Sequence, residues 1–191
     1  MTTTPHSTLH TPHSTLHTSH SSSRLPWLLF ISAVVILLDR LSKNWVRQHI
    51  ELGRAIPVIP KVFRITHVLN DGAAFSLFAD SATPEHVRWG LIAFSTAAAL
   101  AVLIALLRMG RNLTLTTLAL ALVLGGAIGN DYDRIRFASV VDFLEIHIVN
   151  YHWPDFNVAD SAIVVGACLL LLDALITKKP APETAEKAPA N

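Results

Sequence analysis

The chain has 191 residues, of which 51% are hydrophobic and only 15% are charged, and its mean hydropathy is +0.44. Soluble domains carry roughly 25% charged residues, so this deficit indicates a membrane protein. The net charge of +1 argues against a nucleic-acid partner, and the single cysteine excludes an intrachain disulfide.

Residues 1–24 form a low-complexity segment in which Thr-Pro-His-Ser-Thr-Leu-His occurs at 4–10 and again at 11–17. This segment holds five of the ten histidines and almost no large apolar side chains. It cannot bury enough surface to fold, so we predict a disordered tail, with weak metal binding by its histidines as the alternative. We also expect residues 179–191 to be a disordered cytoplasmic tail. The first apolar run lies too far from the start for a typical cleaved signal peptide, so we expect it to stay as an anchor.

Four apolar runs follow this tail and predict four membrane-spanning helices. They cover residues 25–38, 89–107, 113–128 and 161–176. A helix needs about 20 residues to cross a bilayer. The first, third and fourth runs reach that length only if Asp39, Asn130 and Asp160 are included in the helices. The pattern therefore predicts polar groups just inside one face of the membrane.

Loop lengths predict the topology. A tight link at 108–112 joins the second and third runs, whereas the other two links are long. Both long loops then lie on one side and both termini on the other. Basic residues in the tight link and the C-terminal tail favour cytoplasmic termini. The long loops are also rich in Lys and Arg, but the rule gives short loops more weight.

The long loops show strand-like alternation. Apolar and polar residues alternate over 62–69 and again over 144–148, and Asp71-Gly72 is a turn signal. We therefore expect a small β-sheet on the extracytoplasmic side. Such a sheet would hold Asp142 over the helix bundle.

Two aspartates, Asp142 and Asp160, carry the strongest functional signal. A carboxylate close to hydrocarbon is costly, so each is a candidate functional residue. If the two meet, their like charges would make them share one proton, as in an acid–base pair. Taken singly, Asp160 could be only a helix N-cap and Asp142 only a solvated strand residue.

Other polar groups cluster at the same membrane face. Asp39 and Lys43 share one helix face, which could be an interfacial cap with Lys43 reaching the lipid headgroups. Asp133 and Arg134 could form a structural ion pair or could set the field around a carboxylate. His147 and His152 match neither a helical i, i+4 pair nor a recognised ligand pattern, so we predict no metal site there.

Taken in order, five segments resemble the bacterial lipoprotein signal peptidase (signal peptidase II) family. They are Leu38-Asp39-Arg40-Leu41-Ser42-Lys43, Asn70-Asp71-Gly72-Ala73-Ala74-Phe75-Ser76, Gly125-Gly126-Ala127-Ile128-Gly129-Asn130-Asp131-Tyr132-Asp133-Arg134, Val140-Val141-Asp142-Phe143 and Phe156-Asn157-Val158-Ala159-Asp160. The resemblance implies an α-helical membrane protein whose peptidase domain spans residues 25–178. It also implies an intramembrane aspartyl endopeptidase that cuts a prolipoprotein just before its diacylglyceryl-modified cysteine.

The resemblance assigns Asp142 and Asp160 to the catalytic dyad. It assigns the following residues to substrate-binding or support positions: Asp39, Lys43, Asn70, Gly72, Gly126, Asn130, Asp133, Arg134, Asn157 and Ala159. It implies no metal or other cofactor, a monomer in contact with membrane lipid, and a place in the bacterial inner membrane with the active site near the extracytoplasmic face.

The chain departs from the family pattern at two positions. Ala138 stands where the family usually has glycine, and we expect a small effect unless that backbone needs a positive φ. Arg40 replaces a more usual glutamine.

Two other functional classes remain open on the residues alone. A proton-coupled transporter would distribute carboxylates across the membrane thickness, whereas the helix centres here carry none. A non-catalytic scaffold would tolerate loss of both aspartates.

Overall fold

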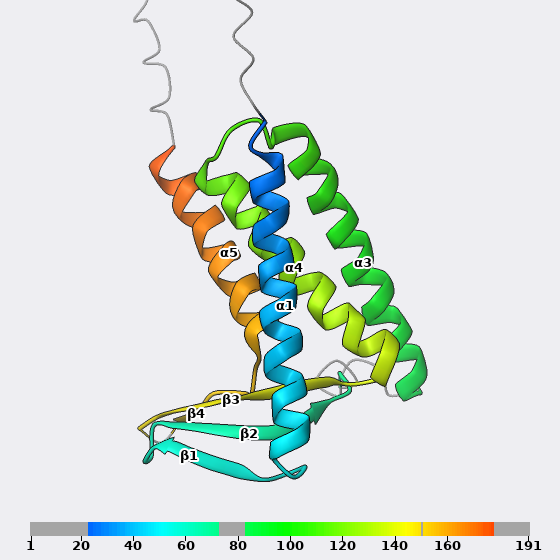
Figure 1. Cartoon of the computed structure of the whole chain (residues 1–191), viewed down its shortest axis with the longest axis vertical. Helices are drawn as coiled ribbons and strands as arrows, with labels where there is room; N and C mark the ends of the chain where they lie inside the picture. Colours follow the sequence, from blue (N-terminus) through cyan, green and yellow to red (C-terminus); the bar gives the residue numbers. More distant parts are fainter. Residues whose placement is uncertain (1–22, 73–82, 150, 178–191) are drawn as a thin grey trace, which may run out of the picture.

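The computed structural model describes residues 23–72, 83–149 and 151–177. The two predicted tails therefore lie almost wholly outside the described residues, as do Ala73 to Ser76 of the second motif. Four helices stand side by side, and a small sheet lies across one end of them (Figure 1).

The four predicted membrane helices are confirmed. They are α1 (Leu25–His49), α3 (Pro84–Met109), α4 (Leu115–Phe137) and α5 (Val158–Ile176). Each of the four is long and apolar enough to cross a membrane. The polar residues Asp39, Asn130 and Asp160 all lie inside helices, as the lengths of the apolar runs required.

Helix α4 is the centre of the bundle and packs against each of the other three helices. Gly125 allows this approach on the side of α1, because an added Cβ would lie 2.8 Å from the carbonyl oxygen of Ser32. Gly166 of α5 allows the close approach of α5 to α4, because an added Cβ would meet the carbonyl oxygen of Ala119. Small residues at helix contacts are typical of membrane bundles. The hydrophobic effect does not drive helices together inside the bilayer, so close packing has to hold them.

The sheet is antiparallel, with strands in the order β1-β2-β3-β4. Its strands are β1 (Ala55–Ile59), β2 (Phe63–Asn70), β3 (Val140–Ile148) and β4 (Tyr151–His152). The alternation in the sequence predicted β2 and the second half of β3. Neither β1 nor the two-residue β4 was predicted, because both are short and exposed and lack alternation.

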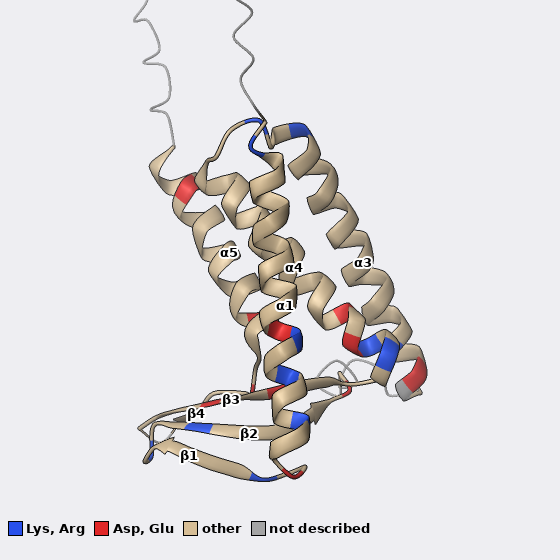
Figure 2. Cartoon of the chain, in the orientation of Figure 1, with Lys and Arg blue, Asp and Glu red and all other residues tan. Residues whose placement is uncertain are grey.

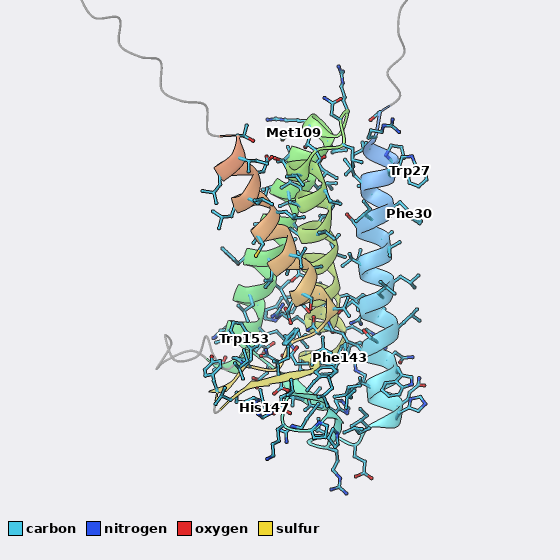
Figure 3. The ribbon with its side chains drawn as sticks, turned by 90° about the vertical axis from the view of Figure 1, so that its left-hand side faces the viewer. Trp27, Phe30, Met109, Phe143, His147 and Trp153 are labelled. Carbon is cyan, nitrogen blue, oxygen red and sulfur yellow. The ribbon has the colours of Figure 1, made fainter. Side chains whose placement is uncertain are left out.

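Both ends of the described chain lie at the end of the bundle opposite the sheet (Figure 1). Charged side chains gather at the sheet end of the bundle (Figure 2). Asp173 lies near the C-terminal end of α5, which ends at Ile176. The side-chain view shows which residues lie at each end: Trp27 and Met109 lie at one end of the bundle, and Phe143, His147 and Trp153 lie at the sheet end (Figure 3). The fold thus concentrates its polar chemistry where helices and sheet meet.

Candidate active site

Asp142 is held at the junction by strand β3. Its neighbours Val141 and Phe143 point to the other face of the strand and pack against Val46 and Ile50 at the end of α1. The Asp142 side chain faces inward and is only 3% exposed, so it is not a solvated strand residue. Asn70 on the paired strand β2 donates from Nδ2 to Asp142 Oδ2 at 2.9 Å.

Asp160 lies in the first turn of α5, where Asn157 and not Asp160 is the N-cap. The Asn157 side chain accepts from the Asp160 amide at 3.0 Å, and the Asp160 carboxylate accepts from the Asn157 amide at 3.2 Å. This reciprocal capping box fixes the position of both side chains. The helix N-terminus also places partial positive charge beside the Asp160 carboxylate.

Two asparagines connect the aspartates. Asn157 Nδ2 donates to Asp142 Oδ1 at 2.8 Å, and Asn130 Nδ2 of α4 donates to Asp160 Oδ1 at 2.7 Å. Asn157 also donates to Asn130 Oδ1 at 3.3 Å. The two carboxylates, which come from β3 and α5, therefore belong to one hydrogen-bonded network.

Burial is the main cause that raises the pKa of Asp142, to about 6. The negative charge of Asp160 raises this pKa as well, whereas the hydrogen bonds from Asn70 and Asn157 and the charge of Lys43 lower it. Asp142 therefore exchanges its proton close to neutral pH, as a general acid or base requires.

A buried ion network lies behind the asparagines. Lys43 Nζ contacts Asp39 Oδ2 at 2.8 Å and Asp133 Oδ2 at 2.9 Å, and it donates to Asn130 Oδ1 at 2.9 Å. Lys43 is fully buried, so the interpretation that it reaches lipid headgroups is wrong. Asp39 in turn accepts from the Ala159 amide at 3.1 Å, which joins α1 to the start of α5.

Asp133 pairs with three cations of α1, namely Lys43, Arg40 at 2.7 Å and Arg47 at 3.2 Å. Arg40, which replaces a usual glutamine, is thus one of its close partners. The suggested ion pair with Arg134 is wrong. Within the described part of the chain, Arg134 makes no hydrogen bond or ion pair with either candidate catalytic aspartate, and its buried Nε has no hydrogen-bond partner.

Two glycines of the predicted site have clear structural reasons. Gly126 lies against α5, where an added Cβ would clash with the Ala159 carbonyl oxygen and Ile163. Gly72 has φ +87°, and its amide donates to Asn70 Oδ1 at 2.9 Å. That bond orients the Asn70 amide group so that its NH₂ points at Asp142.

Ala138, the second departure from the family pattern, ends α4 with φ +65°. We expected the replacement of glycine by alanine to have a small effect unless the backbone needed a positive φ. The structure shows that it does, so the exception applies. A left-handed residue at this position turns the chain from α4 into β3, and glycine would adopt this conformation without the steric cost of a Cβ.

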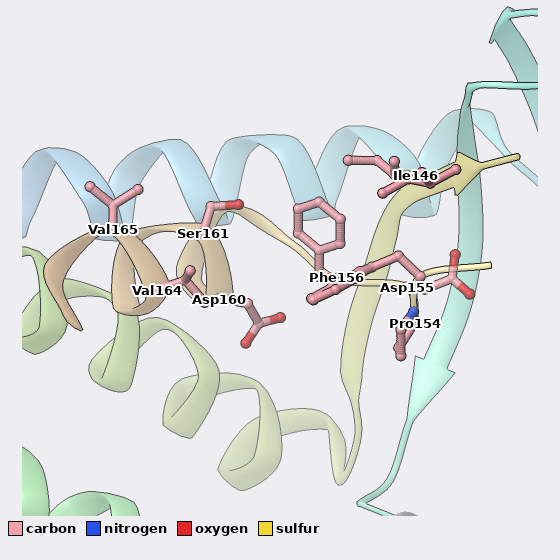
Figure 4. A pocket seen from close by; sticks show the side chains of 10 residues that line it. Ile146, Pro154, Asp155, Phe156, Asp160, Ser161, Val164 and Val165 are labelled. Carbon is pink, nitrogen blue, oxygen red and sulfur yellow. The ribbon is translucent and has the colours of Figure 1, made fainter. Parts of the chain in front are cut away.

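Two hollows flank the aspartates and share Pro154 and Asp155 as lining residues. The larger has a volume of about 530 Å³, is mostly apolar and includes Asp160 (Figure 4). The smaller, of about 300 Å³, includes Asp142 and Asn70. Sequence reasoning missed Asp155, which lines both hollows and accepts from Thr66 Oγ1 at 2.8 Å. Its only signal was its nearness to Asn157 in the chain.

Comparison with known proteins identifies the family. The family model described as signal peptidase (SPase) II matches residues 31–176. Lipoprotein signal peptidases of Pseudomonas putida and Pseudomonas fluorescens are 48% and 46% identical over 157 residues. These alignments cover 82% of this chain and 90% or 91% of the relative.

Two solved structures share the fold, and both are described as bacterial membrane enzymes. The first has a TM-score of 0.73 and 26% identity, and the match covers 84% of this chain and 99% of the other. The second has a TM-score of 0.62 and 28% identity, with coverage of 83% and 95%. The chain therefore belongs to the signal peptidase II family, the aspartic peptidases of the bacterial inner membrane that process lipoprotein signal peptides.

Proposed function

We propose that Asp142 and Asp160 are the catalytic dyad that hydrolyses the prolipoprotein, and that the cut falls just before its diacylglyceryl-modified cysteine. The observation that carries this proposal is the asparagine network. Asn157 and Asn130 bring the buried Asp142 of β3 and the partly buried Asp160 of α5 into one hydrogen-bonded network. A structural ion network would pair each aspartate with a cation, as Lys43 does for Asp39.

The proposed reaction needs one proton between the two carboxylates. The ionised carboxylate takes a proton from water, whose oxygen attacks the scissile carbonyl carbon. The protonated carboxyl donates to the carbonyl oxygen as negative charge develops there. The tetrahedral intermediate then collapses, the C–N bond breaks, and a proton passes to the leaving amine. The pKa of Asp142, raised to about 6, supports a pair that keeps one proton near neutral pH. We assign neither role to a single residue, because coupled groups titrate together.

The hollows suggest how the substrate binds. The apolar cavity beside Asp160 suits the hydrophobic side chains of a signal peptide, and Val164 and Val165 extend its wall along α5. The diacylglycerol chains can remain in the bilayer while the peptide bond reaches the dyad at the interface. This division explains why a lipid-modified cysteine suits a site at the junction of helices and sheet.

We also propose that both termini are cytoplasmic and that the sheet end faces the extracytoplasmic side. The basic link between α3 and α4 supports this orientation. Met109, between Arg108 and Arg111 in the chain, lies at the end opposite the sheet (Figure 3). Residues 25–178 then form the peptidase domain between two tails. Contact with membrane lipid and a monomeric state complete the proposal.

The test is cleavage of a purified diacylglyceryl-modified prolipoprotein, with the product identified by mass spectrometry. We expect wild type to release the signal peptide at the lipidated cysteine, and Asp142→Asn and Asp160→Asn each to lose cleavage. Asp173→Asn is the matched control, because Asp173 lies on α5 with Asp160 but near the other end of that helix. Activity in either dyad variant would overturn the assignment, and so would loss of activity in the control while it remains folded.

A further inference from the structure

The sheet brings together three metal-ligating side chains outside the proposed active site. Glu145 and His147 lie two residues apart on β3, so they project from the same face of the strand. His152 on β4 is the registered cross-strand partner of His147. Sequence spacing led us to predict no metal site at these histidines, because their contact depends on the register of the hairpin and not on a recognised spacing.

The donor atoms of this group converge. His147 Nε2 and His152 Nε2 each lie 2.9 Å from the same oxygen, Glu145 Oε1. All three donor atoms lie within 4.8 Å of one another, and the two imidazole rings stack with centroids 5.0 Å apart. Ligands of a tetrahedral zinc ion, at metal–ligand distances near 2.0–2.1 Å, stand about 3.3 Å apart. Small side-chain movements would therefore admit an ion.

We propose that Glu145, His147 and His152 form a Zn²⁺ site, with water as the fourth ligand. Two imidazoles and one carboxylate are a donor set that zinc accepts readily, whereas calcium and magnesium require oxygen ligands. In the bound state each Nε2 is unprotonated and its ring carries the proton on Nδ1. The ion enters from the solvent side, because His152 is 52% exposed and Glu145 only 3%.

Arg64 acts as the supporting partner of this site. It pairs with both oxygens of Glu145 from the neighbouring strand β2, through Nε at 2.5 Å and through its terminal NH₂ group. Hydrogen bonds to a ligating carboxylate fix its orientation and so favour metal binding. This gain offsets part of the electrostatic repulsion between the guanidinium and the ion. The site thereby connects three strands.

A bound ion would also secure one wall of the apolar cavity. Strand β4 has only two residues, and the chain continues from it through Trp153 and Phe156, which line the cavity. Ile146 and Ile148, on the opposite face of β3 from His147, line it as well. Zinc would hold the β3–β4 hairpin closed and thus keep this wall in place, without taking part in peptide hydrolysis.

The test uses the purified full-length protein in detergent, freed of metal with a chelator, and has no activity readout. Co²⁺ is added as a spectroscopic substitute for Zn²⁺, because tetrahedral Co²⁺ absorbs visible light strongly and octahedral Co²⁺ only weakly. Zn²⁺ affinity is then measured by displacement of Co²⁺. The variants are His147→Ala and His152→Ala, with Arg64→Gln for the supporting partner. His49→Ala is the matched control, since His49 is an exposed histidine outside the group.

We expect wild type and His49→Ala to show the tetrahedral spectrum and equal Zn²⁺ affinity. Loss of either ligand should abolish the spectrum and weaken binding by more than about 100-fold, and Arg64→Gln should weaken it by about 10–100-fold. Zn²⁺ should raise the thermal unfolding temperature of wild type but not of folded His152→Ala. The proposal is overturned if wild type lacks the spectrum. It is also overturned if the spectrum persists in His147→Ala and His152→Ala, because binding would then come from side chains outside this group.

Discussion

Asn157 offers the sharpest test of how the site is tuned, because one side chain performs two separable tasks. Its Oδ1 caps α5, and its Nδ2 donates to Asp142. Asn157→Ser keeps a good N-cap and removes the donor. A hydrogen bond to a charged group contributes about 1.5–3 kcal/mol, and one pKa unit corresponds to about 1.4 kcal/mol. We therefore expect the pKa of Asp142, now about 6, to rise by about one to two units.

The assay is kcat/KM for cleavage of the lipidated prolipoprotein as a function of pH. The limb that reports ionisation of Asp142 should move to higher pH in Asn157→Ser. Asn157→Asp has nearly the same shape and keeps the cap, but it places a carboxylate oxygen beside Asp142, so its shift should be larger. Thermal unfolding of both variants controls for a loss of fold. Profiles that coincide with wild type in both variants, or that move to lower pH, would refute this reasoning.

Three further predictions concern stability in detergent. Ala138→Gly should stabilise the protein by about 1 kcal/mol, because it relieves a Cβ at φ +65°, and an unchanged or lower unfolding temperature would contradict this. Lys43→Met should cost up to about 3–5 kcal/mol, as measured by chemical unfolding, because Asp39 and Asp133 lose the fully buried cation between them and keep only the partly exposed Arg40 and Arg47. A cost below about 1 kcal/mol would show that this ion network is dispensable. Burial raises the pKa of Asp142 from 3.8 to about 6, so the folded state binds this proton more tightly than the unfolded chain. The contribution of Asp142 to stability should fall as the pH rises from about 4 to about 6, and Asp142→Asn should lack this component of the pH dependence.

The amino-acid sequence predicts most of this architecture, because its main features are local. Continuous apolar runs mark the four helices, and alternation marks β2 and part of β3. The inclusion of Asp39, Asn130 and Asp160 in helices follows from bilayer thickness alone. The extension of α1 beyond Lys43 to His49 was not predicted, since Arg47 in this extension pairs with Asp133 from α4, a contact between distant segments.

Contacts between distant segments account for what sequence reasoning missed. Nothing near Arg134 in the chain shows that Asp133 pairs with α1 instead. The capping box that makes Asn157 the N-cap could have been found from its spacing to Asp160. The group around Glu145 could not, because a two-residue strand gives no pattern from which its register can be read.

The central claim is that Asp142 and Asp160 act as one unit, and a double-mutant comparison tests it most directly. Single-turnover cleavage rates of the lipidated prolipoprotein are measured for wild type, Asp142→Asn, Asp160→Asn and the double variant, each shown to be folded. Groups that share one proton fail together, so each single change should reduce the rate as much as both changes combined. Rate losses that multiply, or a single variant that retains substantial activity, would contradict the shared dyad.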